Sequence, residues 1–163
     1  MNLKVLKAAR ERLMDITPMA WDCGMKCEAA CCQPDEDGQG GMYLFSGEEA
    51  LCGGEWAEII PAMMGERQVN MLVCDGECVR DKRPLGCMIF PLTPEVDENG
   101  RVDVRFDYRA RAMCPLLRDG LRGLKKEFVD EVRAALQLIA EDEEGLQFLR
   151  DWQALEVQYD FHL

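Results

Sequence analysis

The feature that most constrains the fold of this chain is the distribution of its nine cysteines. Seven of them lie in two short segments beside turn-forming residues, and an eighth stands directly before a proline: they are Cys23, Cys27, Cys31, Cys32, Cys74, Cys78, Cys87 and, before Pro115, Cys114. Several soft thiolates held a few ångströms apart bind soft or borderline metal ions strongly. The pattern therefore predicts that these eight side chains are metal ligands, whereas the isolated Cys52 is expected to be a small buried core residue.

The spacing within the first segment indicates how its sulfurs meet. Three residues separate Cys23 from Cys27, and Gly24 frees the local backbone, so that both side chains turn towards a common point. The adjacent Cys31 and Cys32 point in different directions in an extended chain, so one can bind at one site while the other faces a second site or the core. Eight sulfurs allow two four-sulfur sites or one site with spare thiols. We expect at least one site to take ligands from both segments.

The kind of metal follows from the ligands that the chain offers. Structural zinc sites usually combine cysteines two residues apart with histidine. The chain has no such cysteine spacing, and its one histidine, His162, is close to the end of the sequence and is expected to be solvated. All-cysteine ligation, three-residue gaps and the Cys114–Pro115 step favour an iron–sulfur cluster of the [4Fe-4S] type. Zinc held by cysteines alone is the alternative.

Charge and hydrophobicity exclude several classes of partner. The formal net charge is −12, from 31 acidic and 19 basic residues, which argues against nucleic acid and against an anionic membrane surface. No apolar run approaches the length of a membrane span, and charged residues occupy positions 1–12, where a signal peptide would carry an apolar stretch. The sequence thus predicts a cytoplasmic protein with reduced thiols, whose partner is another protein.

Hydrophobic periodicity outlines the elements of the first half of the chain. Helices are expected at residues 3–14, from Ser46 onward with Glu49 completing a capping box, and at 55–64 with a kink at Pro61. Residues 19–41 are expected to form a loop, and short strands are expected at 71–73 and 87–92. Arg10 is assigned largely to the polar side of the first helix, and Glu48–Glu49 to a capped helix start.

The second half of the chain has clearer signals. Asn99–Gly100 predicts a two-residue hairpin turn, and Val102, Val104 and Phe106 then alternate with charged residues as in a half-buried strand. From Gly120 to the end the periodicity predicts helix, interrupted at Gly145.

These elements predict a single α+β domain over residues 1–163. Its centre would be an irregular cysteine-rich metal-binding core with a few short strands at 19–116. Helices at 1–18 and 117–163 would flank this core on either side of the sequence.

A resemblance to a known family adds to this interpretation. It is carried by the eight cysteines, by residues 41–49, and by the element Arg83-Pro84-x2-Cys87-x2-Phe90-Pro91. Together they resemble the YkgJ-like cysteine-cluster family, whose members are described as zinc- or iron-chelating proteins. The cluster is also similar to that of flagellin lysine methylases, which implies an iron–sulfur centre. The resemblance covers about residues 19–116 and implies that Arg83 hydrogen-bonds loop carbonyls or the cluster.

The expected function is that of an iron–sulfur protein that transfers electrons or assists the modification of a partner protein. The alternative is a zinc-stabilised protein-interaction module without catalytic activity. An enzyme such as a methyltransferase is the weakest hypothesis, because His162 alone offers no credible nucleophile–histidine dyad and Gly38, Gly40 and Gly41 lack the Lys-Ser/Thr of a nucleotide loop. Arg80 and Lys82 are interpreted as loop charges or as a screen for anionic thiolates.

Overall fold

The protein adopts an α+β fold, as the sequence predicts, in a computed structural model that describes residues 1–33, 41–74 and 78–160. The α-helices are α1 (Leu3–Leu13), α2 (Gly24–Cys27), α3 (Leu85–Ile89), α4 (Ala110–Met113), α5 (Lys126–Ala140) and α6 (Glu143–Asp160). The 3₁₀ helices are η1 (Ala30–Cys32), η2 (Glu48–Ala50), η3 (Arg80–Lys82) and η4 (Pro115–Gly123). The strands are β1 (Met42–Leu44), β2 (Ala57–Met64), β3 (Arg67–Cys74), β4 (Leu92–Val96) and β5 (Val102–Phe106).

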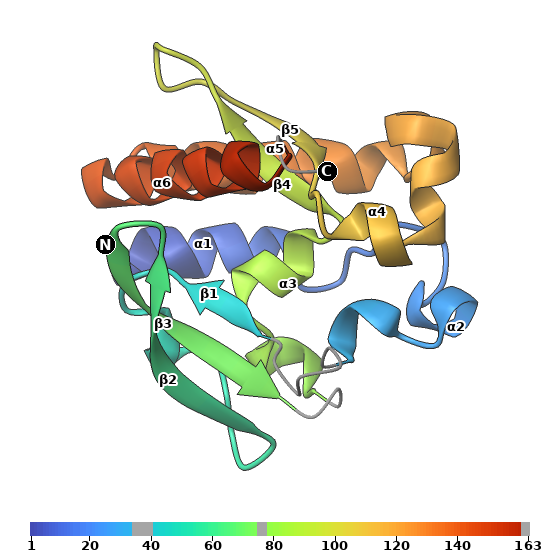
Figure 1. The fold of residues 1–163 in the computed structure, drawn as a ribbon, viewed down its shortest axis with the longest axis horizontal. Coiled ribbons are helices and arrows are strands. Elements are labelled where there is room, and N and C mark those ends of the chain that lie inside the picture. Colours follow the sequence, from blue (N-terminus) through green and yellow to red (C-terminus); the bar gives the residue numbers. More distant parts are fainter. Residues whose placement is uncertain (34–40, 75–77, 161–163) are drawn as a thin grey trace.

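The longer helices form the frame of the molecule. Figure 1 shows α5 and α6 side by side along one side of the fold, with α1 packed against α5. The predicted helix at 3–14 is confirmed as α1, whose first turn is capped by the Asn2 side chain accepting from the Lys4 backbone N–H. The inner face of α1 is fully buried at Leu6 and Leu13. The core around α1 also includes Leu85, Met88 and Ile89 of α3, so it is continuous with the helix that carries Cys87.

A three-stranded antiparallel sheet in the order β1-β3-β2 lies beside α3 (Figure 1). The strand expected at 71–73 is confirmed as part of β3. The helix predicted at 55–64 is wrong, because this stretch is the edge strand β2, paired with β3 from Ala57↔Cys74 to Met64↔Arg67. The β-branched Ile59 and Ile60 favour a strand, and an edge strand tolerates Pro61, which cannot donate a ladder hydrogen bond.

The second sheet is the antiparallel hairpin β4–β5, which packs on α5 and α6. The predicted strand at 102–106 is confirmed, but the turn is longer than two residues, because pairing stops at Val96↔Val102. The Asp97 side chain closes the turn by accepting from the Asn99 and Arg101 backbone N–H groups. The strand predicted at 87–92 is also wrong: α3 occupies Leu85–Ile89, and β4 begins at Leu92, after Pro91.

The helices at the end of the chain begin and end at other residues than the sequence predicts. A 3₁₀ helix covers Pro115–Gly123, and α5 begins only at Lys126. The break between α5 and α6 falls at residues 141–142, whereas Gly145 lies inside the first turn of α6. A Cβ at Gly145 would stand 2.3 Å from the Ile139 carbonyl oxygen, so glycine there allows close approach of the two helices. Along the described parts of the chain, no helix combines the length and apolar character that a membrane span requires.

Candidate metal centre

All eight cysteines predicted to be ligands line one cavity of about 620 Å³, and Cys52 does not. The cavity lies at the C-terminal end of α1, where Ile16, Thr17 and Pro18 form part of its wall. Figure 1 shows α2, α3 and α4 facing one another in this region, at the end of the molecule away from the N-terminus. Three segments far apart in the sequence thus bring their thiols to a common space.

The thiols surround this space without meeting at one point. Within residues 1–33, 41–74 and 78–160, no group of three or more cysteine, histidine, aspartate or glutamate side chains stands at metal-binding distances. All nine cysteines are free thiols, and they range from buried to exposed. His162 and the glycine-rich stretch with Gly38 and Gly40 lie outside the described residues.

The first cysteine segment contains more local structure than the predicted loop. Cys23 precedes the short helix α2 and Cys27 ends it, so the two side chains are one helical turn apart. Glu28 and Ala29 then take left-handed backbone conformations, with φ of 53° and 54°. This turn redirects the chain into η1, which carries the neighbouring Cys31 and Cys32 with their sulfurs 4.0 Å apart.

The second segment holds its thiols through secondary structure on both sides. Cys74 is the last residue of β3, and Cys87 lies in α3. α3 packs closely on the core, because a Cβ at Gly86 would stand 2.3 Å from the Met42 sulfur. Between these elements, Arg83 donates from Nε and Nη2 to Cys78 Sγ at 3.2 and 3.1 Å. Arg83 therefore contacts a sulfur directly, one of the roles that the resemblance implied.

Two further arginines connect the cysteine segments to the frame. Arg80 donates to the carbonyl oxygens of Met14 and Ile16 at 2.8 and 2.9 Å, so it joins the second cysteine segment to the end of α1. Arg109 makes a bidentate ion pair with the buried Asp107, just before α4. Arg80 is thus an anchor between elements, a role that neither of the two interpretations from the sequence included, and Lys82 is exposed.

Cys114 enters the cavity from the third segment, at the end of α4. The loop before α4 is tied to α6, because the Tyr108 backbone N–H donates to Glu156 Oε2 at 3.2 Å. On the other side, α4 contacts η1. The thiol of Cys114 is therefore placed between the helical frame and the first cysteine segment.

Burial makes several of the thiols hard to ionise on their own. Removal from water is the largest cause that raises the pKa of Cys23, Cys87 and Cys114, and neighbouring thiols add to each rise. Buried, mutually repelling thiolates need a cation to offset their charge, which is what a bound metal supplies.

The adjacent pair differs from the other thiols. A hydrogen bond from Cys31, and secondly the charge of Arg83, lower the pKa of Cys32 to about 6 against the opposing effect of burial. The same hydrogen bond is the largest cause that raises the pKa of Cys31. The hydrogen bond and the charge of Arg83 thus favour ionisation of Cys32 over ionisation of Cys31.

A buried ion pair that sequence reasoning missed supports the cavity. Arg10 is 4% exposed and Glu48 is fully buried, and the two are joined at 2.9 Å. Arg10 also donates to the carbonyl oxygens of Asp81 and Arg83 at 3.1 and 2.7 Å, and Glu48 accepts from the Leu85 backbone N–H at 2.6 Å. The pair therefore holds the chain that runs from Cys78 into α3.

The sequence contained a partial signal for this pair. Arg10 follows Leu6 by four residues and precedes Leu13 by three, which places it on the buried face of α1 and not on the polar side. Glu48 does lie at the start of a short helix, but its carboxylate accepts from Phe45, Leu85 and Arg10. Its burial raises its pKa, whereas these three partners lower it.

Cys52 occupies the position expected of a core residue. It is 8% exposed and packs with Leu44 and Leu72 in a small cluster separate from the main core. Its sulfur donates to the Glu48 carbonyl oxygen at 3.0 Å, and burial is the main reason that its pKa rises to about 12.

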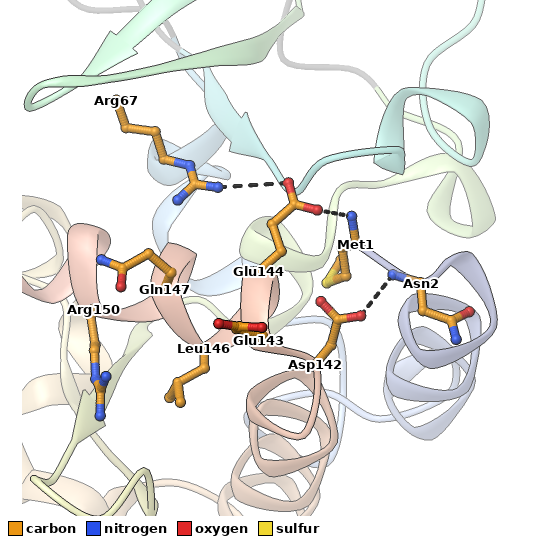
Figure 2. Close-up of a pocket in the computed structure, with 9 residues that line it drawn as sticks. All are labelled: Met1, Asn2, Arg67, Asp142, Glu143, Glu144, Leu146, Gln147 and Arg150. Carbon is orange, nitrogen blue, oxygen red and sulfur yellow. Dashed lines mark hydrogen bonds and ion pairs between the residues drawn. The ribbon is translucent and has the colours of Figure 1, made fainter.

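A second hollow, of about 780 Å³, lies at the opposite end of α1. Figure 2 shows that its charged side chains meet one another: the Met1 amine contacts Glu144, Arg67 approaches Glu144, and the Asn2 backbone N–H donates to Asp142. Arg67 also pairs with Asp151 at 2.8 Å. These contacts join α1, β3 and α6, so we interpret this hollow as part of the frame.

Comparison with protein-family models, curated proteins and solved structures finds no match for this chain. The resemblance to the YkgJ-like family therefore rests on the sequence motifs alone: the eight cysteines, residues 41–49 and the element Arg83-Pro84-x2-Cys87-x2-Phe90-Pro91.

Proposed function

We propose that this protein binds metal on its cysteine thiolates, in the form of an iron–sulfur cluster. The observation that carries the proposal is that the fold places the eight clustered cysteines in one environment and Cys52 in another. The eight that cluster in the sequence line one cavity, and Cys52, the one that the sequence set apart, lies in the core.

The residues of the cavity fit such a group. The donors are soft thiols with no histidine among the lining residues, and all-thiolate ligation is the usual environment of iron–sulfur clusters. The volume of about 620 Å³ offers more room than a single ion needs. Arg83 places positive charge and two N–H donors on one sulfur, which offsets thiolate charge. A bound cluster supplies one-electron transfer; the chain supplies the ligands, their orientation and partial exclusion of water.

The surface beside the cavity supports an action on another protein. Trp21, Met25 and Val79 are 61%, 82% and 52% exposed, and all three lie on the segments that carry the cysteines. Large apolar side chains at the surface favour protein partners, so electron transfer to a partner, or help in its modification, is the proposed role. Nine free thiols suit a reducing compartment such as the cytoplasm.

A zinc-stabilised interaction module is the second candidate. The separation of 4.0 Å between the Cys31 and Cys32 sulfurs favours it, because two thiolates on one tetrahedral zinc ion stand roughly 3.8 Å apart when each bond is about 2.3 Å.

The test is metal and sulfide analysis, with an absorption spectrum, on the full chain purified without air. We expect a brown protein that contains iron and acid-labile sulfide in equal amounts. A colourless protein that contains zinc would establish the second candidate, and a protein that binds neither metal, even after anaerobic reconstitution, would overturn the proposal.

A further inference from the structure

A stretch of opposite charge interrupts this acidic chain between Asp107 and Glu127. Residues 109–126 contain six basic side chains and one acidic side chain, Asp119, so the formal charge of the stretch is +5. The remaining residues contain 13 of the 19 basic and 30 of the 31 acidic side chains, so their formal charge is −17. The stretch contains Cys114 and includes α4 and η4, which places its positive charge beside the cavity.

Building on the proposed function, we propose that α4 and η4 form a docking surface for a protein partner whose own surface is acidic. We refer to the exposed side chains of Arg111, Met113, Arg118 and Arg122 as the α4–η4 surface. Contact with this surface holds the partner next to Cys114, at the edge of the cavity.

The charge on this surface is available to a partner because part of it is not used within the chain. Three of the six basic side chains pair with nearby carboxylates, in the pairs Arg109–Asp107, Lys125–Glu127 and Lys126–Asp130. Arg118 and Arg122 differ from these, since both are exposed and neither side chain forms a hydrogen bond or ion pair with a residue that the structure describes. Two arginines therefore present their full charge to the solvent.

The α4–η4 surface borders the cavity on the side of Cys114. Met113 lines the cavity and is also 38% exposed, so this side chain belongs both to the cavity wall and to the outer surface. Leu116 continues the wall, and Arg118 follows it by two residues, which is about 4 Å along a 3₁₀ helix. Figure 1 shows α4 and the orange ribbon of η4 at the end of the molecule away from the N-terminus.

The charge of the rest of the chain determines which partner is directed to this surface. A basic partner is attracted to the acidic remainder of the molecule and gains no preference for the cavity. An acidic partner is repelled by that remainder and attracted to the α4–η4 surface, so electrostatic steering brings it to Cys114.

The small extent of the surface favours a protein over other polyanions. A nucleic acid or an anionic membrane extends beyond α4 and η4 and meets the surrounding negative charge, which opposes its binding. Met113 adds an exposed apolar side chain that a protein surface can cover, as the core of a protein interface does. We therefore assign the surface to an acidic protein.

The test compares three anionic probes on the full-length chain: a labelled glutamate-rich peptide, a labelled DNA duplex and phosphatidylserine vesicles. Fluorescence anisotropy and vesicle co-sedimentation measure binding at an ionic strength of about 0.1 M, where charges farther apart than about 10 Å are largely screened. We expect the peptide to bind most tightly and to be released by added salt. The double variant Arg118→Glu with Arg122→Glu should bind it roughly 10-fold more weakly or worse, because like charges then meet.

The control makes the same change in net charge elsewhere. Lys4→Glu with Lys7→Glu alters two exposed lysines of α1, outside the cavity wall, and should leave the affinity for the peptide close to that of wild type. Equal losses in the two double variants would mean that net charge alone governs binding, and wild-type protein that does not bind the peptide would overturn the proposal. Tighter binding of DNA or vesicles than of the peptide would also overturn it, in favour of a different class of partner.

A second measurement does not depend on the folding of any variant. Hydrogen exchange of wild-type protein with and without the peptide should show protection at residues 111–122, whereas protection confined to other segments would contradict the proposal. Metal content is measured separately on the same protein. A chain that binds no metal would overturn the proposed function, whereas failure of the peptide to bind a metal-loaded chain would overturn the docking surface alone.

Discussion

The Arg83 side chain contacts one thiol and acts by its charge on two others. Its two N–H groups reach the same sulfur, Cys78 Sγ, and its charge also lowers the pKa of Cys32 and Cys87. Its own pKa is raised, because the hydrogen bond and the thiolate charges together outweigh the cost of burial. The guanidinium therefore stabilises the ionised form that a metal requires.

Replacing Arg83 by alanine should weaken metal binding by roughly 10- to 100-fold, the range found when a residue that supports a metal ligand is lost. Lys82→Ala, one position away and exposed, should leave affinity unchanged and serves as the control. The measurement is competition with a chelator of known affinity, on protein loaded without air. Equal retention in both variants would mean that the Arg83 contact has no part in metal binding.

At the scale of residues, the sequence separated the candidate ligands from a core cysteine but missed the groups that hold the cysteine segments in place. Clustering beside turn residues is a local signal, and it set Cys52 apart correctly. The burial of Arg10 and Glu48 depends on a partner 38 residues away and on backbone groups at 81–85, which no local pattern reveals.

The helix α1 carries one buried and one exposed ion pair, and they give a test of what the buried pair and its contacts contribute. Arg10 joins Glu48 inside the protein, whereas Arg12 meets Glu131 of α5 at the surface. Loss of Arg10 would leave Glu48 as a buried charge without its cation and would release the carbonyl oxygens of Asp81 and Arg83.

We expect Arg10→Ala to lower the free energy of unfolding by about 3–5 kcal/mol, as for other broken buried pairs. Arg12→Ala should cost less than about 1 kcal/mol. Urea denaturation of both metal-loaded variants measures the difference, and metal retention should fall in the first variant alone. Similar costs in the two variants would mean that burial adds nothing to this pair.

The contact between α6 and the loop before α4 should make stability depend on pH. Burial, followed by the charge of Asp107, raises the pKa of Glu156 to about 7 from its ordinary 4.5, against the Tyr108 N–H and the charge of Arg109. Between these values the folded state keeps a proton that the unfolded state has released. The free energy of unfolding therefore falls as pH rises through this window, by up to about 1.4 kcal/mol per pH unit for one proton.

Glu156→Gln should flatten that slope relative to wild type, while Glu143→Gln, at an exposed position of the same helix, should preserve it. Denaturation midpoints from pH 4.5 to pH 7, the two pKa limits, provide the measurement. An unchanged slope in Glu156→Gln would show that this carboxyl group does not titrate in the window.

At the scale of elements, the sequence predicted the helices with a long amphipathic pattern, such as α1, and the strand with clear alternation of apolar and charged residues, β5. It failed at 55–64 and 87–92, where short apolar runs fit either helix or strand. There the decision comes from tertiary neighbours: β3 provides a partner strand for residues 57–64, and the core around Met42 receives α3.

The whole molecule combines a helical frame packed on apolar side chains with cysteine segments that are linked to it by a few polar contacts. Trp152, Phe128 and Leu136, from α5 and α6, are among the most buried side chains of the frame. Thiolates that repel one another need a cation to order them, whereas the apolar contacts between α5 and α6 do not depend on one.

Removal of metal by a chelator should consequently lower the melting temperature and increase hydrogen exchange at residues 19–33 and 78–91, while α5 and α6 remain protected. Hydrogen exchange with mass spectrometry before and after chelation measures this pattern. Unchanged melting temperature and circular dichroism in metal-free protein would contradict it, because the ligand segments would then be stable on their own.

The overall α+β class and the set of candidate ligands could be predicted from the sequence, but the shared cavity could not. Its walls come from residues within 16–33, 41–42, 72–74, 78–91 and 108–116, together with Trp56, and their meeting depends on the packing of α1 on α5 and of α4 on η1. Such long-range packing is not encoded in the spacing of any single motif.

The contact between Pro18 and Lys125 also has a consequence for the order in which the chain folds during synthesis. The Lys125 backbone N–H donates to the Pro18 carbonyl oxygen at 2.8 Å, and α5 then covers α1. All nine cysteines precede α5 in the sequence, and contacts between distant residues form slowly. We therefore expect the first cysteine segment to gain its contact with the helical frame only after α5 has been made.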